Sequence, residues 1–249
     1  MSKYSSSKLR SIIHNCLVSE QTVERNFSDE HYLLCDGTFI EGRKNGLFVI
    51  MNTVESKVVA GRYGIKEKQS VLTQYFSELK SEGLKPKSFT TDGNTAIVRA
   101  LRAVWPNVIV QRCLVHIQRQ GLMWCRVNPK SRAGQKLRLL FLQVTKITDR
   151  HTAENFLQDF FNWNERYGCK LLMGKTRGWV VSDLIRARSM LLNAIPDMFH
   201  FLNDPNIPNT TNALEGYFSR LKAKYWQHRG LARHNRENYF RWYLSVVKR

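Results

Sequence analysis

The chain has 249 residues, enough for one large domain with a core or for a core that carries an insertion. Hydrophobic residues make up 43% and aromatic residues 11%, a composition that excludes an intrinsically disordered chain. No run approaches the roughly 18 apolar residues of a membrane span, and the N-terminus lacks the apolar region of a secretory signal. Five irregularly spaced cysteines do not suggest a disulfide framework. These features indicate a protein of the reducing cytoplasm without a membrane partner.

The net charge of +19 is concentrated in two segments. Between Gly93 and Thr148 the sequence has ten Lys or Arg and no acid, and from Gly216 to Arg249 it has nine basic residues and one acid. Such concentrated charge favours a nucleic acid partner, because the release of counterions from phosphates drives binding. The alternatives are a basic surface that only keeps the protein soluble and a surface for anionic lipid.

The N-terminal half predicts alternating strands and helices. The first 30 residues predict a short helix and a lead-in, followed by a three-strand meander at His31–Ile40, Gly46–Val54 and Lys57–Tyr63. Apolar spacing with Gly and Pro breaks then predicts a helix, a strand, a helix and a strand at Lys68–Gly83, Lys87–Thr91, Asn94–Val104 and Asn107–Gln111. The order β-β-β-α-β-α-β is that of an RNase H-like α/β fold, a mixed sheet flanked by helices.

The C-terminal half predicts helices. Leu114 to about Leu202 has a wholly helical pattern that is rich in Trp and Arg. Pro205 and Pro208 break this pattern in a polar loop, and a last helix is expected to start at Thr210 or Thr211.

Two aspartates occupy strand positions in this layout. Asp36 lies inside the first predicted strand, where a carboxylate is costly unless it is paired or bound to a metal; the alternative is a turn aspartate in an Asp-Gly pair. Asp92 ends the fourth predicted strand, and the alternative for it is a helix cap. The first and fourth strands are neighbours in this fold, so both carboxylates would meet at one edge, where two close carboxylates repel unless a cation lies between them.

A third carboxylate opens the last predicted helix. Leu214, Tyr217 and Leu221 belong to an apolar stripe at helical spacing, and Glu215 lies on the face beside it. The alternative role of Glu215 is a first-turn acid favoured by the helix dipole and by capping from Thr211 or Asn212. Asp36, Asp92 and Glu215 together suit two-metal phosphoryl transfer with Mg²⁺ or Mn²⁺, because hard cations prefer oxygen ligands.

A Cys-x-x-His pair, Cys113 and His116, follows the fifth predicted strand. The pair has the chemistry of half a zinc site, although the remaining candidates, Cys125, His151 and Cys169, lack the usual spacing. The alternative is a buried cysteine beside a hydrogen-bonded histidine.

Four short motifs in a fixed order resemble the Mutator-type DDE transposases of bacterial insertion sequences and related eukaryotic elements. They span about residues 31 to 235 and are Asp36-Gly37, Thr91-Asp92-Gly93, Gln111-x-Cys113-x-x-His116, and Thr210 or Thr211 with Asn212 and Glu215. The resemblance implies a catalytic domain of residues 31–116 and 210–249, preceded by a lead-in of residues 1–30 and interrupted by a helical insertion of residues 117–209. It also implies catalysis and binding of two Mg²⁺ or Mn²⁺ ions by Asp36, Asp92 and Glu215, cleavage of DNA at element ends, and transfer of the 3′ ends into target DNA.

The family also implies partners. Joining two ends of double-stranded DNA to a target implies a homodimer or larger assembly, which would be associated with the nucleoid. The family's Cys-x-x-His signature implies a role in handling DNA for Cys113 and His116. Basic runs predict further phosphate contacts at Lys175, Arg177, Arg220, Lys222, Lys224 and Arg229. Their aromatic neighbours Trp179, Tyr225 and Trp226 are expected either to stack on unpaired bases or to lie in the core.

Two departures from the family pattern keep alternatives open. Arg119-Gln120 stands where many members have Arg-Asn, and only about 30 residues precede the first strand, where typical members have a DNA-binding region. A separate chain that recognises the ends would compensate for this region. The alternative is a truncated, non-catalytic DNA-binding regulator of transposition. A third candidate, a nuclease such as a junction resolvase, is disfavoured by the long helical segment before Glu215.

Overall fold

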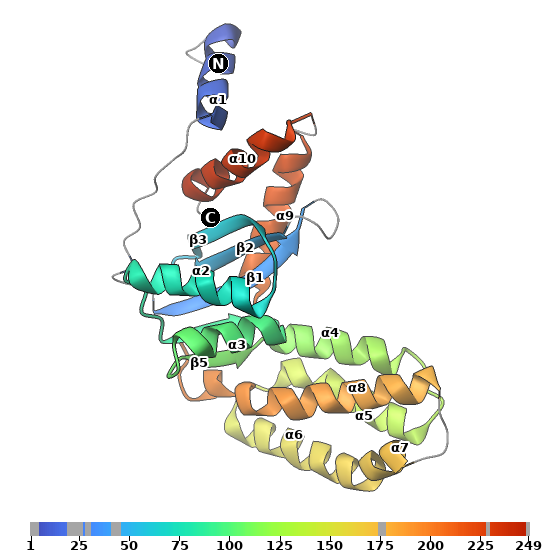
Figure 1. Ribbon diagram of the computed structural model, residues 1–249. Coiled ribbons are helices and arrows are strands. Elements are labelled where there is room, and N and C mark those ends of the chain that lie inside the picture. The colour runs from blue at the N-terminus through green and yellow to red at the C-terminus, as the bar shows by residue number, and fades with distance from the viewer. Residues whose placement is uncertain are drawn as a thin grey trace. The chain divides into compact units, whose positions relative to one another are not determined.

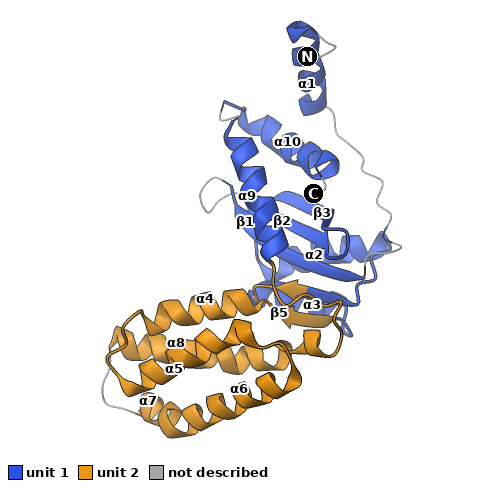
Figure 2. Cartoon of the chain, turned by 180° about the vertical axis from the view of Figure 1, so that it is seen from behind, with its two compact units in different colours: residues 1–89, 94–108, 212–249 blue, residues 90–93, 109–211 orange. Residues whose placement is uncertain are grey.

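A computed structural model describes residues 5–18, 27, 31–40, 46–173, 178–227 and 230–247 (Figure 1). The chain divides into two compact units (Figure 2). Unit 1 comprises residues 1–89, 94–108 and 212–249, and unit 2 comprises residues 90–93 and 109–211.

Five strands form a mixed sheet in the order β3-β2-β1-β4-β5. Their bounds are β1 Tyr32–Phe39, β2 Gly46–Asn52, β3 Lys57–Ile65, β4 Ser88–Thr91 and β5 Ile109–Arg112. The first three strands form the predicted antiparallel meander, and β1 and β4 are neighbours as expected. Helices α2 (Gln69–Ser81) and α3 (Thr95–Val104) complete the predicted β-β-β-α-β-α-β order, so the mixed α/β class is confirmed.

Helices cover both faces of the meander in unit 1 because side chains alternate along each strand. All seven residues of β2 are buried. Leu47, Val49 and Met51 pack with helices α9 (Asn212–Trp226) and α10 (Arg233–Val246). Phe48 points to the other face, where its ring lies 5.7 Å from that of Phe76 in α2.

The N-terminal helix α1 (Ser6–Val18) contacts α10 through two hydrogen bonds to its last turn. Trp242 Nε1 donates to Cys16 O at 2.5 Å, and Asn238 Nδ2 donates to Leu17 O at 2.7 Å. A short helix in the first 30 residues is therefore confirmed.

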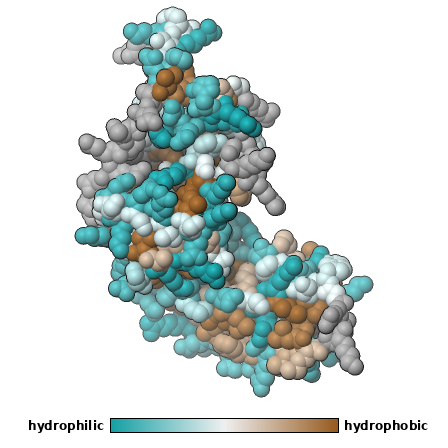
Figure 3. Space-filling view, viewed as in Figure 1, coloured by the Kyte–Doolittle hydropathy of each residue, from teal (hydrophilic) through white to brown (hydrophobic). Residues whose placement is uncertain are grey.

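Unit 2 is a helical body with its own core. Its helices are α4 Leu114–Cys125, α5 Arg132–Gln143, α6 Arg150–Trp163, α7 Cys169–Met173 and α8 Trp179–Ala194, with a π-helical turn η3 at Asn164–Gly168 and 3₁₀ turns η2 Val144–Lys146, η4 Ile195–Asp197 and η5 His200–Leu202. Leu137, Phe141 and Leu191 are among the fully buried residues of this core. The described residues from Leu114 to Leu202 are mainly helical, with non-helical links such as the one between α4 and α5. Hydrophobic side chains also reach the surface of these helices (Figure 3), and no helix among the described residues is long and apolar enough to cross a membrane.

One helix was missing from the sequence-based prediction. The helix expected at Thr210 or Thr211 begins at Asn212, but it is not the last, because α10 follows it. Basic and polar side chains interrupt the apolar pattern of α10, in which only Phe240 and Leu244 are buried. Aromatic contacts compensate: the rings of Phe240 and Tyr63 stack at 4.5 Å.

The close approach of α4 and α5 depends on Gly121. A Cβ atom at this position would overlap the ring of Phe141, which is fully buried and has no room to move. We expect Gly121→Ala to lower the free energy of unfolding by about 1–3 kcal/mol through overpacking. In the control Gly216→Ala, in α9, the new Cβ would lie 3.5 Å from Arg220 Nη1, an ordinary contact, and stability should rise by about 0.5–1 kcal/mol. Urea denaturation measures both changes, and equal effects of the two substitutions would contradict the packing argument.

Candidate active site

Asp36 lies inside β1, not in a turn. The β1–β2 pairing runs without a break from Leu33 opposite Asn52 to Phe39 opposite Gly46, and Asp36 is opposite Val49. The hairpin-turn interpretation of Asp36 is therefore wrong. Its side chain is half-buried, and Oδ1 accepts a hydrogen bond of 2.7 Å from the backbone N–H of Gly37.

Glu215 belongs to the helix that covers the same face of β1. Asp36 and Leu34 point to one side of the strand because they are two residues apart. Leu34 packs in one core cluster with Leu214, the neighbour of Glu215, and α9 contacts β1 (Figure 2). Within unit 1, two half-buried carboxylates therefore lie on the same side of the sheet. Glu215 is also in the first turn of α9, so its favourable interaction with the helix dipole remains.

Glu67, which follows β3, approaches Gly37 from the other side of β1. A Cβ atom at Gly37 would overlap the Glu67 carboxylate, so this position admits only glycine while Glu67 keeps its place. Glu67 Oε2 accepts a hydrogen bond of 2.8 Å from Asn94 Nδ2. The sequence analysis missed Glu67, since nothing in its local sequence indicates contact with Gly37.

Asp92 directly follows β4 and is not the cap of α3. Asn94 is the N-cap: its Oδ1 accepts from the backbone N–H of Ala96 at 2.9 Å. The capping interpretation of Asp92 is therefore wrong. Its side chain is half-buried, and Oδ1 accepts a hydrogen bond of 3.3 Å from the hydroxyl of Thr91.

Arg112, at the end of β5, interacts electrostatically with this aspartate. Its Nη2 donates to the backbone O of Asp92 at 3.4 Å, and a Cβ atom at Gly93 would overlap the guanidinium. Burial lowers the pKa of Arg112, while the negative charges of Asp92 and Asp197 oppose this shift. The Nε atom is buried and has no hydrogen-bond partner among the residues that the structure describes. Sequence reasoning did not assign a role to Arg112, although it lies inside the Gln-x-Cys motif.

Cys113 and His116 form a hydrogen-bonded cluster with Thr211. The buried Cys113 Sγ accepts from both the backbone N–H and the hydroxyl of Thr211, each at 3.4 Å, and the hydroxyl lies 3.3 Å from His116 Nδ1. Burial alone would raise the pKa of the Cys113 thiol, but hydrogen bonds from His116 and Thr211 outweigh burial and lower it. Thr211 immediately precedes α9, so the cluster fixes the point at which the chain leaves unit 2 for the helix of Glu215.

No group of three or more His, Cys, Asp or Glu side chains in the described part of the chain is arranged to hold a metal ion. The remaining zinc candidates, Cys125, His151 and Cys169, therefore do not form such a group with other described residues. Cys125 is buried, which raises its pKa to about 12, and His151 and Cys169 are exposed. Cys113 and His116 thus match the expected buried cysteine and hydrogen-bonded histidine.

Comparison with known proteins identifies the family. The model of the family "Transposase, Mutator family" matches residues 28–173, more than half of the chain. The chain belongs to the Mutator family of transposases. The matched span includes Asp36, Asp92, Cys113 and His116, and Glu215 lies outside it.

A curated relative of this Mutator-family chain is the transposase for insertion sequence element IS1201 of Lactobacillus helveticus. The two are 24% identical over 223 residues, which cover 81% of this chain and 53% of the relative. The chain thus spans about half the length of the curated relative that it matches.

The predicted DNA contacts of this Mutator-family chain are only partly described by the structure. Lys175, Arg177 and Arg229 lie outside the described residues. Arg220 and Lys224 are exposed on α9, and Lys222 is half-buried. Tyr225 is a core residue at 2% exposure, whereas Trp179 and Trp226 are 65% and 54% exposed, so the core interpretation is wrong for these two tryptophans.

The lowered pKa of Cys113 gives a testable pH dependence for this Mutator-family chain. A thiol whose pKa is depressed in the folded state contributes stability that is present above its unfolded pKa of about 8.5 and is lost as pH falls through the folded pKa. We therefore expect the free energy of unfolding of wild type, relative to that of Cys113→Ala, to increase as pH rises. Denaturant unfolding of both proteins between about pH 6 and pH 9.5 measures this difference.

Cys125→Ala is the matched control with the opposite sign. Burial raises the Cys125 pKa to about 12, so its contribution to stability should fall as pH rises above about 8.5. Parallel pH profiles for the two variants would refute the assigned hydrogen bonding of Cys113.

Proposed function

We propose that the chain is a DDE transposase that cuts DNA strands at the ends of an insertion element and joins their 3′ ends to target DNA. Asp36, Asp92 and Glu215 are the proposed catalytic carboxylates. The observation that carries the proposal is the placement of Asp36 and Glu215 on one side of the sheet, both half-buried, in a chain that belongs to a transposase family. The neighbouring positions of β4 and β1 in the sheet support including Asp92, as does the finding that Asn94 and not Asp92 caps α3.

The proposed site takes two divalent ions, Mg²⁺ or Mn²⁺. Three carboxylates are the hard oxygen donors that these cations prefer, so the donor chemistry fits. Bound there, the ions would lower the pKa of the attacking water or 3′-hydroxyl and stabilise the leaving oxygen. The residues of the chain hold the ligands in place: β1 orients Asp36, the Cys113–Thr211 cluster fixes the start of α9, and Arg112 partly balances the charge of Asp92.

The proposed architecture is an RNase H-like catalytic domain of residues 31–116 and 210–249 with a helical insertion at residues 117–209. The β-β-β-α-β-α-β order supports this assignment. The proposed partners are double-stranded DNA at the element ends and target, and a second copy of the chain.

The second candidate function is a non-catalytic DNA-binding regulator of transposition. It is favoured by the finding that the described residues hold no ready group of three metal-binding side chains. Such a regulator would keep the basic surface of α9 and bind DNA without cutting it.

Strand cleavage and joining distinguish the two functions. The substrate is a pre-nicked duplex with the terminal sequence of the chain's own insertion element, incubated with Mg²⁺ or Mn²⁺. We expect products from wild type, and a loss of at least about a hundredfold in rate for Asp36→Asn, Asp92→Asn and Glu215→Gln, because each removes a metal ligand.

Glu154→Gln, an exposed acid in α6, is the matched control and should cut at the wild-type rate. Intact DNA binding without products from wild type would instead support the regulator. Unchanged cleavage by the three variants would refute the assigned carboxylates.

The basic face of α9 gives a separate prediction on DNA affinity. Lys222→Glu with Lys224→Glu should weaken duplex binding and flatten its dependence on salt, because fewer counterions are released. Lys66→Glu with Lys85→Glu, two exposed lysines elsewhere in unit 1, makes the same change of net charge. Fluorescence anisotropy at several salt concentrations would refute the contacts if both double variants changed the salt slope equally.

A further inference from the structure

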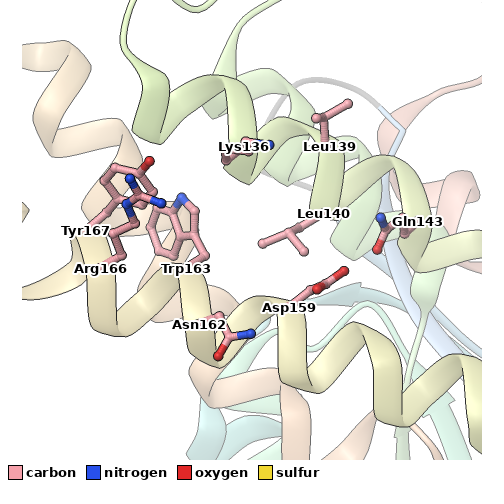
Figure 4. A pocket seen from close by; sticks show the side chains of 9 residues that line it. All are labelled: Lys136, Leu139, Leu140, Gln143, Asp159, Asn162, Trp163, Arg166 and Tyr167. Atoms are coloured by element: carbon pink, nitrogen blue, oxygen red, sulfur yellow. The ribbon is translucent and has the colours of Figure 1, made fainter.

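A pocket of about 270 Å³ opens between α5 and α6 in unit 2, away from the proposed carboxylates in sequence. Figure 4 shows Trp163 and Leu140 between the two helices, with Arg166 and Tyr167 at one end and Gln143 at the other. The volume is slightly below the roughly 300–1,000 Å³ of typical small-molecule pockets. A ligand of a single ring system therefore fits it better than a large one.

The floor of the pocket is apolar and preformed. Leu140 and Trp163 are 5% and 4% exposed. The indole Nε1 of Trp163 donates to the backbone O of Ala133 at 2.9 Å, and its ring stacks on that of Phe160 at 6.2 Å. These contacts fix the orientation of Trp163, so a planar ligand would find its packing surface already in place.

The rim of the pocket is polar and exposed. Lys136 and Arg166 supply two cations, and Asp159 and Asn162 supply a carboxylate and an amide. Cations at the rim suit phosphate, whereas carboxylates and amides are the groups that hydrogen-bond to the edges of bases.

A π-helical turn brings Arg166 and Tyr167 to the pocket. The turn, Asn164–Gly168, interrupts the helix that would otherwise continue from α6 into α7. Arg188 Nε donates to Asn164 Oδ1 at 2.5 Å, and a Cβ atom at Gly168 would lie 2.5 Å from the same oxygen. Such turns are rare and occur frequently at functional sites, and this one supplies two of the residues that line the pocket.

The pocket continues along the helices. A second hollow of about 230 Å³ shares Gln143 and Asp159 with the first and reaches Lys146. We call these two hollows together the groove; their lining residues come mainly from α5 and α6. Helix α5 has no acidic residue, so the groove suits a polyanionic strand on that side.

We propose that this groove holds an unpaired DNA strand and that its pocket receives one base. The base packs against Trp163 and Leu140, its flanking phosphates bind Lys136 and Arg166, and its edge bonds to Asp159 and Asn162. Asp159 can only accept hydrogen bonds when ionised, so cytosine and adenine, which carry exocyclic amino groups, fit better than thymine. The proposal rests on the proposed function only in taking DNA as the ligand.

Photocrosslinking of the full chain to a short single strand with one 5-iodocytosine tests the proposal. The reaction is run without divalent ions, and peptide mapping locates the crosslink. We expect the principal crosslink in the α6–η3 segment, Arg150–Gly168, which includes Trp163 and Tyr167. Lys136→Gln with Arg166→Gln should lower its yield at least about fivefold.

The matched control is Lys130→Gln with Arg132→Gln, two exposed cations that do not line the pocket. This control should keep the crosslink at the wild-type yield, and circular dichroism confirms that both variants are folded. Asp159→Ala provides a second test. In wild type, unlabelled oligo(dC) should compete with the crosslinking strand better than oligo(dT) does, and in the variant the two should compete equally well.

Crosslinks only outside this segment would overturn the proposal, as would an equal loss in both double variants. The outcome is separate from that of the cleavage assay. If the chain crosslinks in this segment but does not cut DNA, the base-binding pocket is supported and the proposed catalysis is refuted. If the chain cuts DNA but does not crosslink in this segment, only the base-binding pocket is refuted.

Discussion

A half-buried carboxylate inside the sheet is the constraint on which the rest of unit 1 depends. Asp36 lies next to the buried Cys35 and beside β2, all of whose residues are buried. A charge in such a place lowers stability unless hydrogen bonds, water or a cation compensate for it. Helix α9 adds a second carboxylate, Glu215, to the same side of the sheet. Carboxylates that come close to each other repel and so increase the free energy gained from binding a cation, which is the physical basis of the proposed metal site.

The two Asp-Gly pairs have a common structural cause. Gly37 leaves room for the carboxylate of Glu67, and Gly93, at a φ of 87°, leaves room for the guanidinium of Arg112. In each pair the glycine therefore admits a charged side chain from another element directly beside the aspartate. The Cys113–His116–Thr211 cluster acts further along the chain, where it fixes the residue before α9. Charged and hydrogen-bonding groups around the three acids are thus positioned by tertiary contacts that bring together segments far apart in the sequence.

The sequence was sufficient to predict the order of strands and helices through β5, because apolar periodicity and Gly or Pro breaks are local signals. Beyond β5 it predicted a helical stretch and a later helix near Thr211, but not the separate helices between them. It did not predict α10, whose apolar residues are interrupted by basic side chains and packed mainly through aromatic rings. Periodicity also could not tell that Trp179 and Trp226 face solvent while Tyr225 is buried. Glu67 and Arg112 were missed for another reason: their contacts with Gly37 and Gly93 exist only after distant segments meet. The capping and turn interpretations of Asp92 and Asp36 could be rejected only from hydrogen bonds and strand register.

The most direct test of the central claim is to ask whether the three acids share bound ions. Fe²⁺ replaces Mg²⁺ in solution with ascorbate and peroxide, and the hydroxyl radicals that it generates cut the backbone close to the bound ion. The account predicts cuts near Asp36, Asp92 and Glu215 together, suppressed by excess Mg²⁺ and lost in all three places on Asp36→Asn. Cuts near only one of these residues, or cuts that persist at all three in the variant, would contradict a shared site.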